Sequence, residues 1–451
     1  MNDSRGGVSP DMLGRAKHVI TTKVDILLLG SGGREHAMLK KLAESPRVGK
    51  LWVAPGNGGM LQMAEKADVD PNDPEAVATF AKEHHIRLVV IGPEAPLVAG
   101  VADAVRAAHI PCFGPSADAA QMEGSKEFAK KVMEKAGVPT AAWKAFTDQA
   151  ACEGYVRELG GPCVVKADGL AAGKGVVVAQ STDEALAAVR SCFEGAFGEA
   201  GSTVVVEEML KGPECSLLAL TDGKALVPLA ASQDHKRALD GDLGPNTGGM
   251  GVYSPVPIVT EEELDQMAEI ERRVLAELHH EGIDYRGCLY GGFMLTKDGP
   301  KVLEFNARFG DPETQVVLSR MEADLLDVFL ACDDGTLMNE PIDWKEKWAV
   351  SVVLTSAGYP GSYEKGKRIT GIEDAEALDG VTVYHAGDAL AEDGSLVTAG
   401  GRVLDVTALG DTFEAARDLA YKACELIDFE GKTYRSDIGL RALRGRAAWE
   451  V

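Results

Sequence analysis

The chain has 451 residues, of which 45% are hydrophobic and 26% charged, and its formal net charge is −24. This length predicts about two to four domains with packed cores. The acidic balance disfavours nucleic acid and anionic membrane surfaces as partners, and no apolar run is long enough to span a membrane.

Residues 1–23 are rich in Gly, Ser and charged side chains and contain no apolar run. They are expected to form a flexible extension, not a signal peptide. The chain has eight cysteines, none in a C-x-x-C pair, and several lie inside apolar runs. This pattern favours buried free thiols in a reducing cytoplasm.

From Val24 onward, short apolar strands alternate with helices, and each strand ends in a Gly- or Pro-rich turn. The expected strands cover residues 24–29, 51–54, 88–91 and 111–113. Such alternation predicts a Rossmann-like parallel sheet with helices on both faces, and we assign residues 24–125 to this N-terminal α/β domain. Ligands of such sheets bind at the carboxyl ends of the strands, where all four turns lie.

The first of these turns, Gly30-Ser31-Gly32-Gly33, follows a strand and opens a helix. A turn of this kind can present backbone N–H groups to an anion. A nicotinamide or flavin fingerprint is disfavoured, because Glu35 occupies the position of its third glycine. The phosphate of a smaller ligand fits better, and a tight turn without any ligand is the alternative.

Ser125 can cap a helix that begins at Lys126, and we place the first domain boundary there. Farther on, Lys166 ends an apolar strand and a glycine-rich loop, residues 169–175, follows it. A glycine loop carrying a lysine can close over a triphosphate, although the spacing is not that of a P-loop. The alternative for Lys174 is a solvated hairpin tip.

The next strand, residues 203–210, ends in paired glutamates and could offer backbone groups to an adenine edge, with Glu214 near the ribose. The loop at residues 234–251 is long and glycine-dense, and long loops in compact proteins are usually functional or disordered. His235 within it is assigned no chemistry. Asp-Gly pairs at 222–223 and 298–299 predict antiparallel hairpins.

The segment Val302 to Glu313 carries the most informative pattern of the chain. Glu304 and Asn306 are two positions apart on an expected strand, so both point to one face and can offer oxygen ligands to Mg²⁺. Arg308 can pair with a carboxylate or phosphate. Asp311-Pro312-Glu313 predicts a helix start in which Asp311 is the N-cap.

Residues 126–340 are therefore expected to form a second domain, with a mobile lid at about residues 148–213. Residues 341–451 contain short strands and a helix at 412–427, which predicts a small β-rich C-terminal domain. The whole is a multidomain protein of α/β and α+β class.

Five stretches together resemble the phosphoribosylamine–glycine ligase family of ATP-grasp enzymes. They are residues 32–37 (GGREHA), 92–97 (GPEAPL), 166–176 (KADGLAAGKGV), 245–251 (PNTGGMG) and 304–315 (EFNARFGDPETQ). The resemblance runs from about Val24 into the C-terminal domain. It implies an ATP-grasp central domain and a ligase of de novo purine biosynthesis, which we expect to be a cytoplasmic monomer. The implied reaction joins glycine to 5-phosphoribosylamine, with ATP and Mg²⁺ or Mn²⁺ as cofactors, without nucleic acid or membrane as partner.

The resemblance also implies roles for individual residues. The implied ATP contacts are Lys126, Lys166, Gly173, Lys174, Gly175, Glu207, Leu210 and Glu214, and the implied metal ligands are Glu304 and Asn306. The implied substrate contacts are Gly32, Gly33, Asn57, Glu94, Asp234, Lys236, Arg308 and Gly310, with Arg308 and Asp311 as candidate catalytic residues. The preceding strand supplies no third acidic ligand, which leaves the number of metal ions open.

Three other functions compete with this interpretation. Another ATP-grasp enzyme could use bicarbonate or formate, and a non-catalytic regulator could bind nucleotide on the same fold. A nicotinamide oxidoreductase is disfavoured by Glu35.

Overall fold

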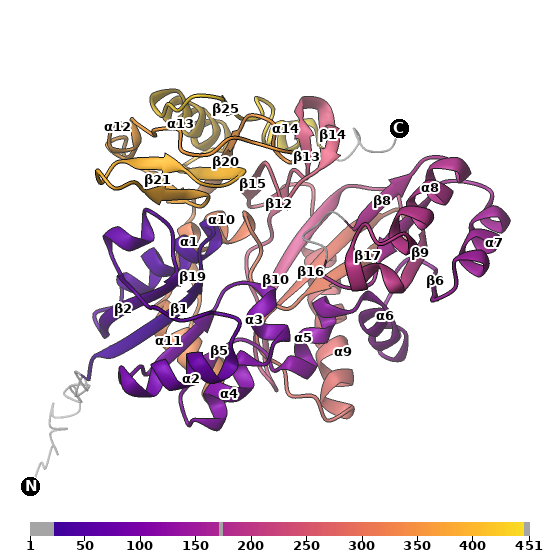
Figure 1. Cartoon of the computed structure of the whole chain (residues 1–451), viewed down its shortest axis with the longest axis horizontal. Coiled ribbons are helices and arrows are strands. Elements are labelled where there is room, and N and C mark those ends of the chain that lie inside the picture. Colours follow the sequence, from indigo (N-terminus) through magenta and orange to yellow (C-terminus); the bar gives the residue numbers. More distant parts are fainter. Residues whose placement is uncertain (1–21, 171–174, 446–451) are drawn as a thin grey trace, which may run out of the picture.

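The computed structural model describes residues 22–170 and 175–445. Figure 1 shows three parts: an N-terminal α/β part, a central part that extends away from it, and a C-terminal part stacked above the first. Residues 1–21 of the expected extension, and Gly173 and Lys174 of the expected phosphate loop, lie outside the described residues. None of the described helices is long and apolar enough to cross a membrane.

The N-terminal part contains a five-stranded sheet in the order β3-β2-β1-β4-β5, and all of its pairs are parallel, as predicted. Its strands are β1 (Val24–Gly30), β2 (Val48–Pro55), β3 (Glu65–Lys66), β4 (Leu88–Ile91) and β5 (Cys112–Phe113). Its helices are α1 (Gly33–Ala43), α2 (Pro74–Glu83), α3 (Glu94–Val98), α4 (Val101–Ala107) and α5 (Ala117–Gly124). Strand β4 is buried at every position, which is what helices on both faces of a parallel sheet produce.

The central part contains two antiparallel sheets. The sheet β6-β9-β7-β8, here called the lid sheet, consists of β6 (Trp143–Phe146), β7 (Cys163–Ala167), β8 (Val176–Ala179) and β9 (Val204–Glu208). It carries helices α7 (Gln149–Leu159) and α8 (Thr182–Phe193). The sheet β11-β10-β16-β17, here called the body sheet, consists of β10 (Glu214–Asp222), β11 (Leu226–Pro228), β16 (Arg286–Thr296) and β17 (Gly299–Asn306). The predicted hairpins at 222–223 and 298–299 are confirmed.

Helices α6 (Lys126–Lys135) and α9 (Glu261–His280) complete the central part. Helix α10 (Glu313–Arg320) lies between α1 and the C-terminal sheet, and α11 (Leu325–Asp334) follows it. Helix α9 packs on the body sheet, and α11 joins it to the N-terminal part, because Phe329 stacks on Phe113 with 3.7 Å between ring centroids. This packing fixes the edge of the N-terminal sheet against the body sheet.

The C-terminal sheet has the order β12-β15-β20-β24-β21, with β25 also paired to β20. Its strands are β12 (Gln233–Asp234), β15 (Gly251–Ser254), β20 (Trp348–Ser356), β21 (Val381–His385), β24 (Arg402–Gly410) and β25 (Lys432–Thr433). Its helices are α12 (Ile372–Glu376), α13 (Phe413–Leu426) and α14 (Leu440–Arg444). Two-stranded pairs are formed by β13 (Arg237–Leu239) with β14 (Leu243–Asn246), β18 (Met321–Glu322) with β19 (Asp343–Trp344), and β22 (Asp388–Leu390) with β23 (Leu396–Thr398).

Strands β12 and β15 belong by sequence to the expected central domain, yet they extend the C-terminal sheet. The expected cut at residue 340 therefore does not separate two independent sheets. Strand β12 and the segment after it instead connect the C-terminal sheet to the central cavity, since Asp234 on β12 and Lys236 beyond it line that cavity.

Candidate active site

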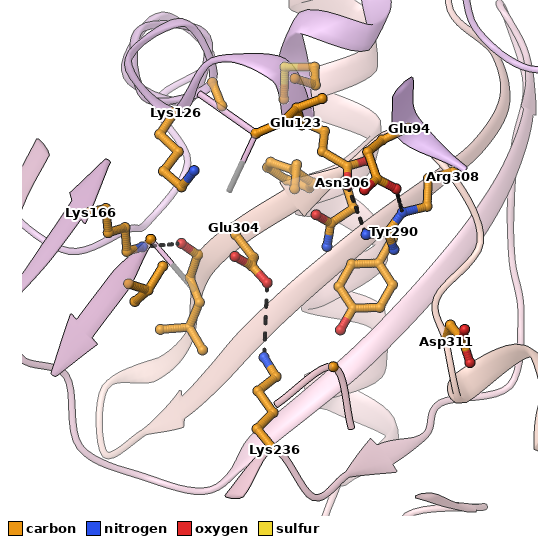
Figure 2. A pocket seen from close by; sticks show the side chains of 18 of the residues that line it. Glu94, Glu123, Lys126, Lys166, Lys236, Tyr290, Glu304, Asn306, Arg308 and Asp311 are labelled. Atoms are coloured by element: carbon orange, nitrogen blue, oxygen red, sulfur yellow. Dashed lines mark hydrogen bonds and ion pairs between the residues drawn. The ribbon is translucent and has the colours of Figure 1, made fainter. Parts of the chain in front are cut away.

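A cavity of about 440 Å³ lies where the three parts meet. Figure 2 shows charged side chains from all sides directed into it, with Lys126 and Lys166 facing Glu304. Eleven of the predicted site residues line it: Glu94, Lys126, Lys166, Gly175, Glu207, Asp234, Lys236, Glu304, Asn306, Arg308 and Asp311. Segments separated by more than 200 residues thus converge on one space.

Glu304 and Asn306 lie on β17 and both line the cavity, as the alternation along a strand predicts. Burial raises the pKa of Glu304, but nearby cations, first Lys236 and then Lys166, lower it by more. The net result is a pKa below the ordinary value of a glutamate. The Nζ of Lys236 is 3.9 Å from the Glu304 Oε1. The carboxylate is therefore ionised at neutral pH and available to a cation.

The chemistry of this pair fits a divalent cation such as Mg²⁺. One carboxylate and one amide oxygen are hard ligands, and Mg²⁺ commonly takes few protein ligands together with substrate phosphates and water. Within residues 22–170 and 175–445, no group of three or more His, Cys, Asp or Glu side chains could hold a metal ion by itself. The two predicted ligands on β17 would therefore suit a metal that arrives with a phosphorylated substrate.

Lys126 and Lys166 approach this pair from two different elements. Lys126 is the first residue of α6, which Ser125 caps by accepting a hydrogen bond from the Phe128 N–H at 3.1 Å, as predicted. Lys166 lies on β7 of the lid sheet, and its Nζ donates to the Leu303 carbonyl on β17 at 3.0 Å. The lysine thereby connects the lid sheet to the strand that carries Glu304.

Glu207 does not direct its carboxylate toward an open part of the cavity. Its Oε1 is 2.9 Å from the Nζ of Lys166 and 3.2 Å from the Nζ of Lys130, and the residue is only 2% exposed. The Glu207 carboxylate is therefore engaged within the protein, and an adenine contact of this residue stays a prediction. Leu210 and Glu214 do not line this cavity; the Glu214 carboxylate is 3.3 Å from the Nζ of Lys236.

Asp234 is the other buried carboxyl group beside Lys236. Burial raises its pKa to about 7, although Lys236 acts in the opposite direction. Lys236 itself has a pKa above its ordinary value because the nearby carboxylates, first among them Glu214 and Asp234, outweigh the effect of burial. The two residues thus place one firmly held positive charge below Glu304, as Figure 2 shows for Lys236.

Arg308 is held between two carboxylates of the N-terminal part. Its Nη2 is 2.8 Å from the Glu123 Oε1 and its Nε is 3.3 Å from the Glu94 Oε2. Burial alone would lower the pKa of Arg308, but Glu123 and Glu94 more than compensate and raise it. Burial raises the pKa of Glu123 despite the arginine. The guanidinium is therefore fixed in position at the edge of the cavity.

Asp311 does not cap a helix, so that prediction is wrong. Helix α10 begins at Glu313, Pro312 takes the N-cap position, and no side chain caps the helix. The Asp311 carboxylate instead accepts from Gln315 Nε2 at 2.8 Å and from Arg402 Nη2 at 3.0 Å. Arg402 comes from β24, so a long-range partner has replaced the local capping bond.

Three glycines that were predicted to contact the substrate are closely surrounded by other groups of the protein. The Gly32 N–H donates to Glu35 Oε2 at 2.7 Å, so this donor is not free for an anion. A Cβ at Gly33 would lie 1.8 Å from Asp405 Oδ2, which places the C-terminal part directly against the turn. A Cβ at Gly310 would lie 2.5 Å from Glu313 Oε2.

Asn57 joins two parts of the molecule. Its Nδ2 donates to the carbonyls of Ser31 and His385, at 2.9 and 2.8 Å, and its Oδ1 accepts from the Met60 N–H. Both amide hydrogens are therefore used within the protein, and Asn57 does not line the cavity. A substrate role for these turn residues stays a prediction.

Several residues that line the cavity were not identified from the sequence: Arg34, Glu123, Lys130, Tyr290, Glu313 and Arg402. Tyr290 donates to Glu313 Oε1 at 3.0 Å and lies 2.8 Å from Ser216 Oγ, which forms a buried polar network. One sequence signal was available for Lys130, because it lies four residues after Lys126 and so on the same face of a helix. The partners of the others are too distant in sequence for any local pattern.

Comparison with known proteins gives consistent matches along the chain. Family models match three segments: Phosphoribosylglycinamide synthetase N domain at residues 24–123, its ATP-grasp (A) domain at 124–314 and its C domain at 349–441. A phosphoribosylamine–glycine ligase of Rhizobium meliloti is 51% identical over 94% of this chain and 100% of the relative. That of Pseudomonas aeruginosa is 49% identical over 93% of this chain and 98% of the relative.

Solved structures agree with these matches. A crystal structure of phosphoribosylamine–glycine ligase from Thermotoga maritima is 35% identical, with a TM-score of 0.80 over 92% of this chain and 100% of that chain. A crystal structure of a biotin carboxylase–β-γ-ATP complex from Campylobacter jejuni has a TM-score of 0.72 at 15% identity, and the match covers 92% of this chain and 93% of that chain. At that identity the likeness concerns the fold alone.

Proposed function

The chain belongs to the phosphoribosylglycinamide synthetase family, and on this premise we propose that it joins glycine to 5-phosphoribosylamine at the expense of ATP. The products are glycinamide ribonucleotide, ADP and phosphate, formed through a glycyl phosphate, and the reaction is a step of de novo purine biosynthesis. The observation that carries the proposal is the convergence of Lys126 and Lys166 on Glu304 and Asn306 in one cavity.

The chemistry explains why such a cavity is needed. A carboxylate and an amine do not condense in water, so a glycine carboxylate oxygen first attacks the γ-phosphorus and ADP leaves. The amine nitrogen of phosphoribosylamine then attacks the acyl carbon, the C–O bond to phosphate breaks, and the nitrogen loses a proton. Both steps depend on positioning and charge neutralisation more than on a covalent protein catalyst.

Residues of this chain would divide these tasks. Glu304 and Asn306 would hold the divalent cation, which neutralises phosphate charge when bound. Lys126 and Lys166 would contact the triphosphate, and Arg308 would hold the glycine carboxylate or the acyl phosphate. We propose Mg²⁺ or Mn²⁺ as the metal, because carboxylate and amide oxygens suit both.

The decisive experiment is an ADP-release assay with glycine and freshly generated phosphoribosylamine, from which each component is omitted in turn. Turnover should require all of them, and bicarbonate or formate should not replace glycine. Glu304→Gln should reduce kcat by about 100-fold or more, since one metal-binding charge is lost. ADP release that ignores glycine, or metal-dependent turnover unchanged in Glu304→Gln, would refute the assignment.

We also propose a cytoplasmic monomer that acts on small molecules and not on nucleic acid. All eight cysteines are buried free thiols, which suits a reducing compartment, and the net charge of −24 opposes binding to polyanions. Light scattering after size-exclusion chromatography should give one 47.7 kDa chain per particle. A dimer at micromolar concentration would contradict the proposal.

A further inference from the structure

Two lysines, one of them the proposed phosphate-binding residue Lys166, share a single carboxylate oxygen of Glu207. Glu207 Oε1 is 2.9 Å from the Nζ of Lys166 and 3.2 Å from the Nζ of Lys130. Lys130 and Glu207 are each 2% exposed and Lys166 is 6% exposed. Two buried cations therefore face one anion, which leaves one positive charge in excess.

The position of Lys130 is fixed by bonds that do not involve a ligand. Its Nζ donates to Thr140 Oγ1 at 2.7 Å, and that hydroxyl donates to the Val302 carbonyl at 2.7 Å. Val302 and Leu303 lie on β17, just before Glu304. Lys130 on α6 and Lys166 on β7 thus hold the Glu207 carboxylate from two sides, and both are connected to the metal-binding strand.

Stability alone does not explain this arrangement. A second buried lysine beside the first adds repulsion and a desolvation cost, and buried charges that lack an equal partner are costly. Ionisable groups with perturbed pKa values that lie in a cleft are candidates for ligand binding. All three residues line the cavity, so the ligand that would balance the excess charge is an anion held there.

We propose that Lys130 is a positioning residue for nucleotide binding: because Lys130 and Lys166 share the one carboxylate of Glu207, that carboxylate does not cancel the charge of both lysines, and a net positive charge remains for the phosphates. This inference rests on the proposed function, because it takes the anion to be the polyphosphate of ATP. Without Lys130, Glu207 and Lys166 form a one-to-one pair, and the net positive charge disappears.

Nucleotide binding tests the proposal without any turnover. A unit charge that acts over about 10 Å at an effective dielectric constant of about 20 changes affinity roughly tenfold. Lys130→Met should therefore raise the Kd of ATP and of ADP about tenfold, measured by calorimetry, and leave the Kd of uncharged adenosine unchanged. Lys131→Met is the matched control, since Lys131 is 57% exposed on the same helix and pairs only with Glu127 among the described ion pairs.

The pH dependence gives a second readout. Burial lowers the pKa of Lys130 to about 8, against the raising effect of Glu207, while Lys166 lowers it and Glu208 raises it. ATP affinity of the wild-type protein should fall as pH rises through about 8, and Lys130→Met should lack that fall. Thr140→Val removes the bond to the ammonium group and should move the fall to lower pH, which keeps the test open if Lys130→Met does not fold.

Opposite results would overturn the inference. One is a Kd of Lys130→Met for ATP within twofold of the wild-type value. The other is an equal rise in the Kd of adenosine, because that would indicate a damaged pocket. Wild-type protein that binds ATP but shows no glycine-dependent turnover would refute the proposed function and leave the role of Lys130 standing.

Discussion

Arg308 shows how a single side chain can connect structure and chemistry. It is held by Glu94 and Glu123 of the N-terminal part and lies on the loop that follows β17, which carries the proposed metal ligands. Replacing Arg308 with Met leaves two carboxylates without their shared cation. Since Glu123 is buried, we expect the free energy of unfolding to fall by about 3 kcal/mol, as measured by urea denaturation.

The control for this variant is Arg272→Met, since Arg272 lies on the exposed face of α9 and its carboxylate partner Glu269 is 3.5 Å away. That substitution should change stability by no more than about 0.5 kcal/mol. Adding Glu123→Gln to Arg308→Met should restore part of the loss. If Arg308→Met were as stable as the control, the two carboxylates would not depend on the guanidinium.

At this scale, the sequence predicted those side chains whose position follows from a local period. Glu304 and Asn306 share a face because a strand alternates, and Lys126 begins a helix because Ser125 caps it. Arg402 and Asp405 could not be predicted, because they reach Asp311 and Gln315 from a strand about 90 residues away in the chain. The same long-range partner explains why Asp311 failed as an N-cap.

At the scale of elements, the helices differ in how much room they leave for a side chain at their glycines. Gly154 lies inside α7 of the lid, and a Cβ there would meet nothing within 4 Å. Gly154→Ala should therefore stabilise the helix by about 0.5–1 kcal/mol through lower backbone entropy of the unfolded chain. Urea denaturation, or slower amide hydrogen exchange in α7, measures this stabilisation. A loss of stability would mean that α7 has a close neighbour in solution.

Gly33 at the start of α1 is the opposite case. A Cβ would lie 1.8 Å from Asp405 Oδ2 and 2.6 Å from Gln315 Nε2, so the side chains of Asp405 and Gln315 would both have to move. We expect Gly33→Ala to destabilise the protein by about 2 kcal/mol and to lower kcat, because Gln315 also bonds Asp311. A folded variant with unchanged Tm and activity would show that this contact can relax.

Most elements follow from local signals, whereas sheet membership does not. The Asp-Gly pairs predicted both hairpins of the body sheet, and the strand-turn-helix pattern predicted the parallel sheet. The pairing of β15 with β20 joins residues that are almost 100 positions apart, and nothing in either segment specifies its partner. Local patterns give the strand, but only tertiary packing selects the neighbour.

At the scale of the whole molecule, the contact between the N-terminal and C-terminal parts contains two histidines. His36 Nδ1 accepts from the His385 N–H at 2.8 Å, and His385 Nδ1 bonds Asp388 Oδ2. Gly58 in turn donates to Asp388 Oδ1 at 2.9 Å. Burial first, and then His385 and Lys40, lowers the pKa of His36 well below its ordinary value.

This contact should make stability depend on pH. The folded protein keeps His36 neutral, while the unfolded chain binds a proton below about pH 6.5, so stability is lost as pH falls below that value. Between pH 7 and 5.5, wild type should lose about 1 kcal/mol more than His36→Gln, whose amide oxygen can still accept the His385 N–H. His280→Gln, on an exposed position of α9, should follow wild type. Parallel curves for wild type and His36→Gln would contradict the assignment.

The path of the chain through β12 and β15 has a consequence for how the protein can be divided. A polypeptide shortened to residue 340 would keep β15 but lose β20, its hydrogen-bonding neighbour, and would present a bare edge to other molecules. Such a fragment should self-associate. The division of the chain into three family segments would instead suggest that the first two can fold without the third. The three segments follow one another along the chain, but the second supplies strands to the sheet of the third. A chimaera that takes its C-terminal segment from a relative must therefore take residues 233–254 from that relative as well.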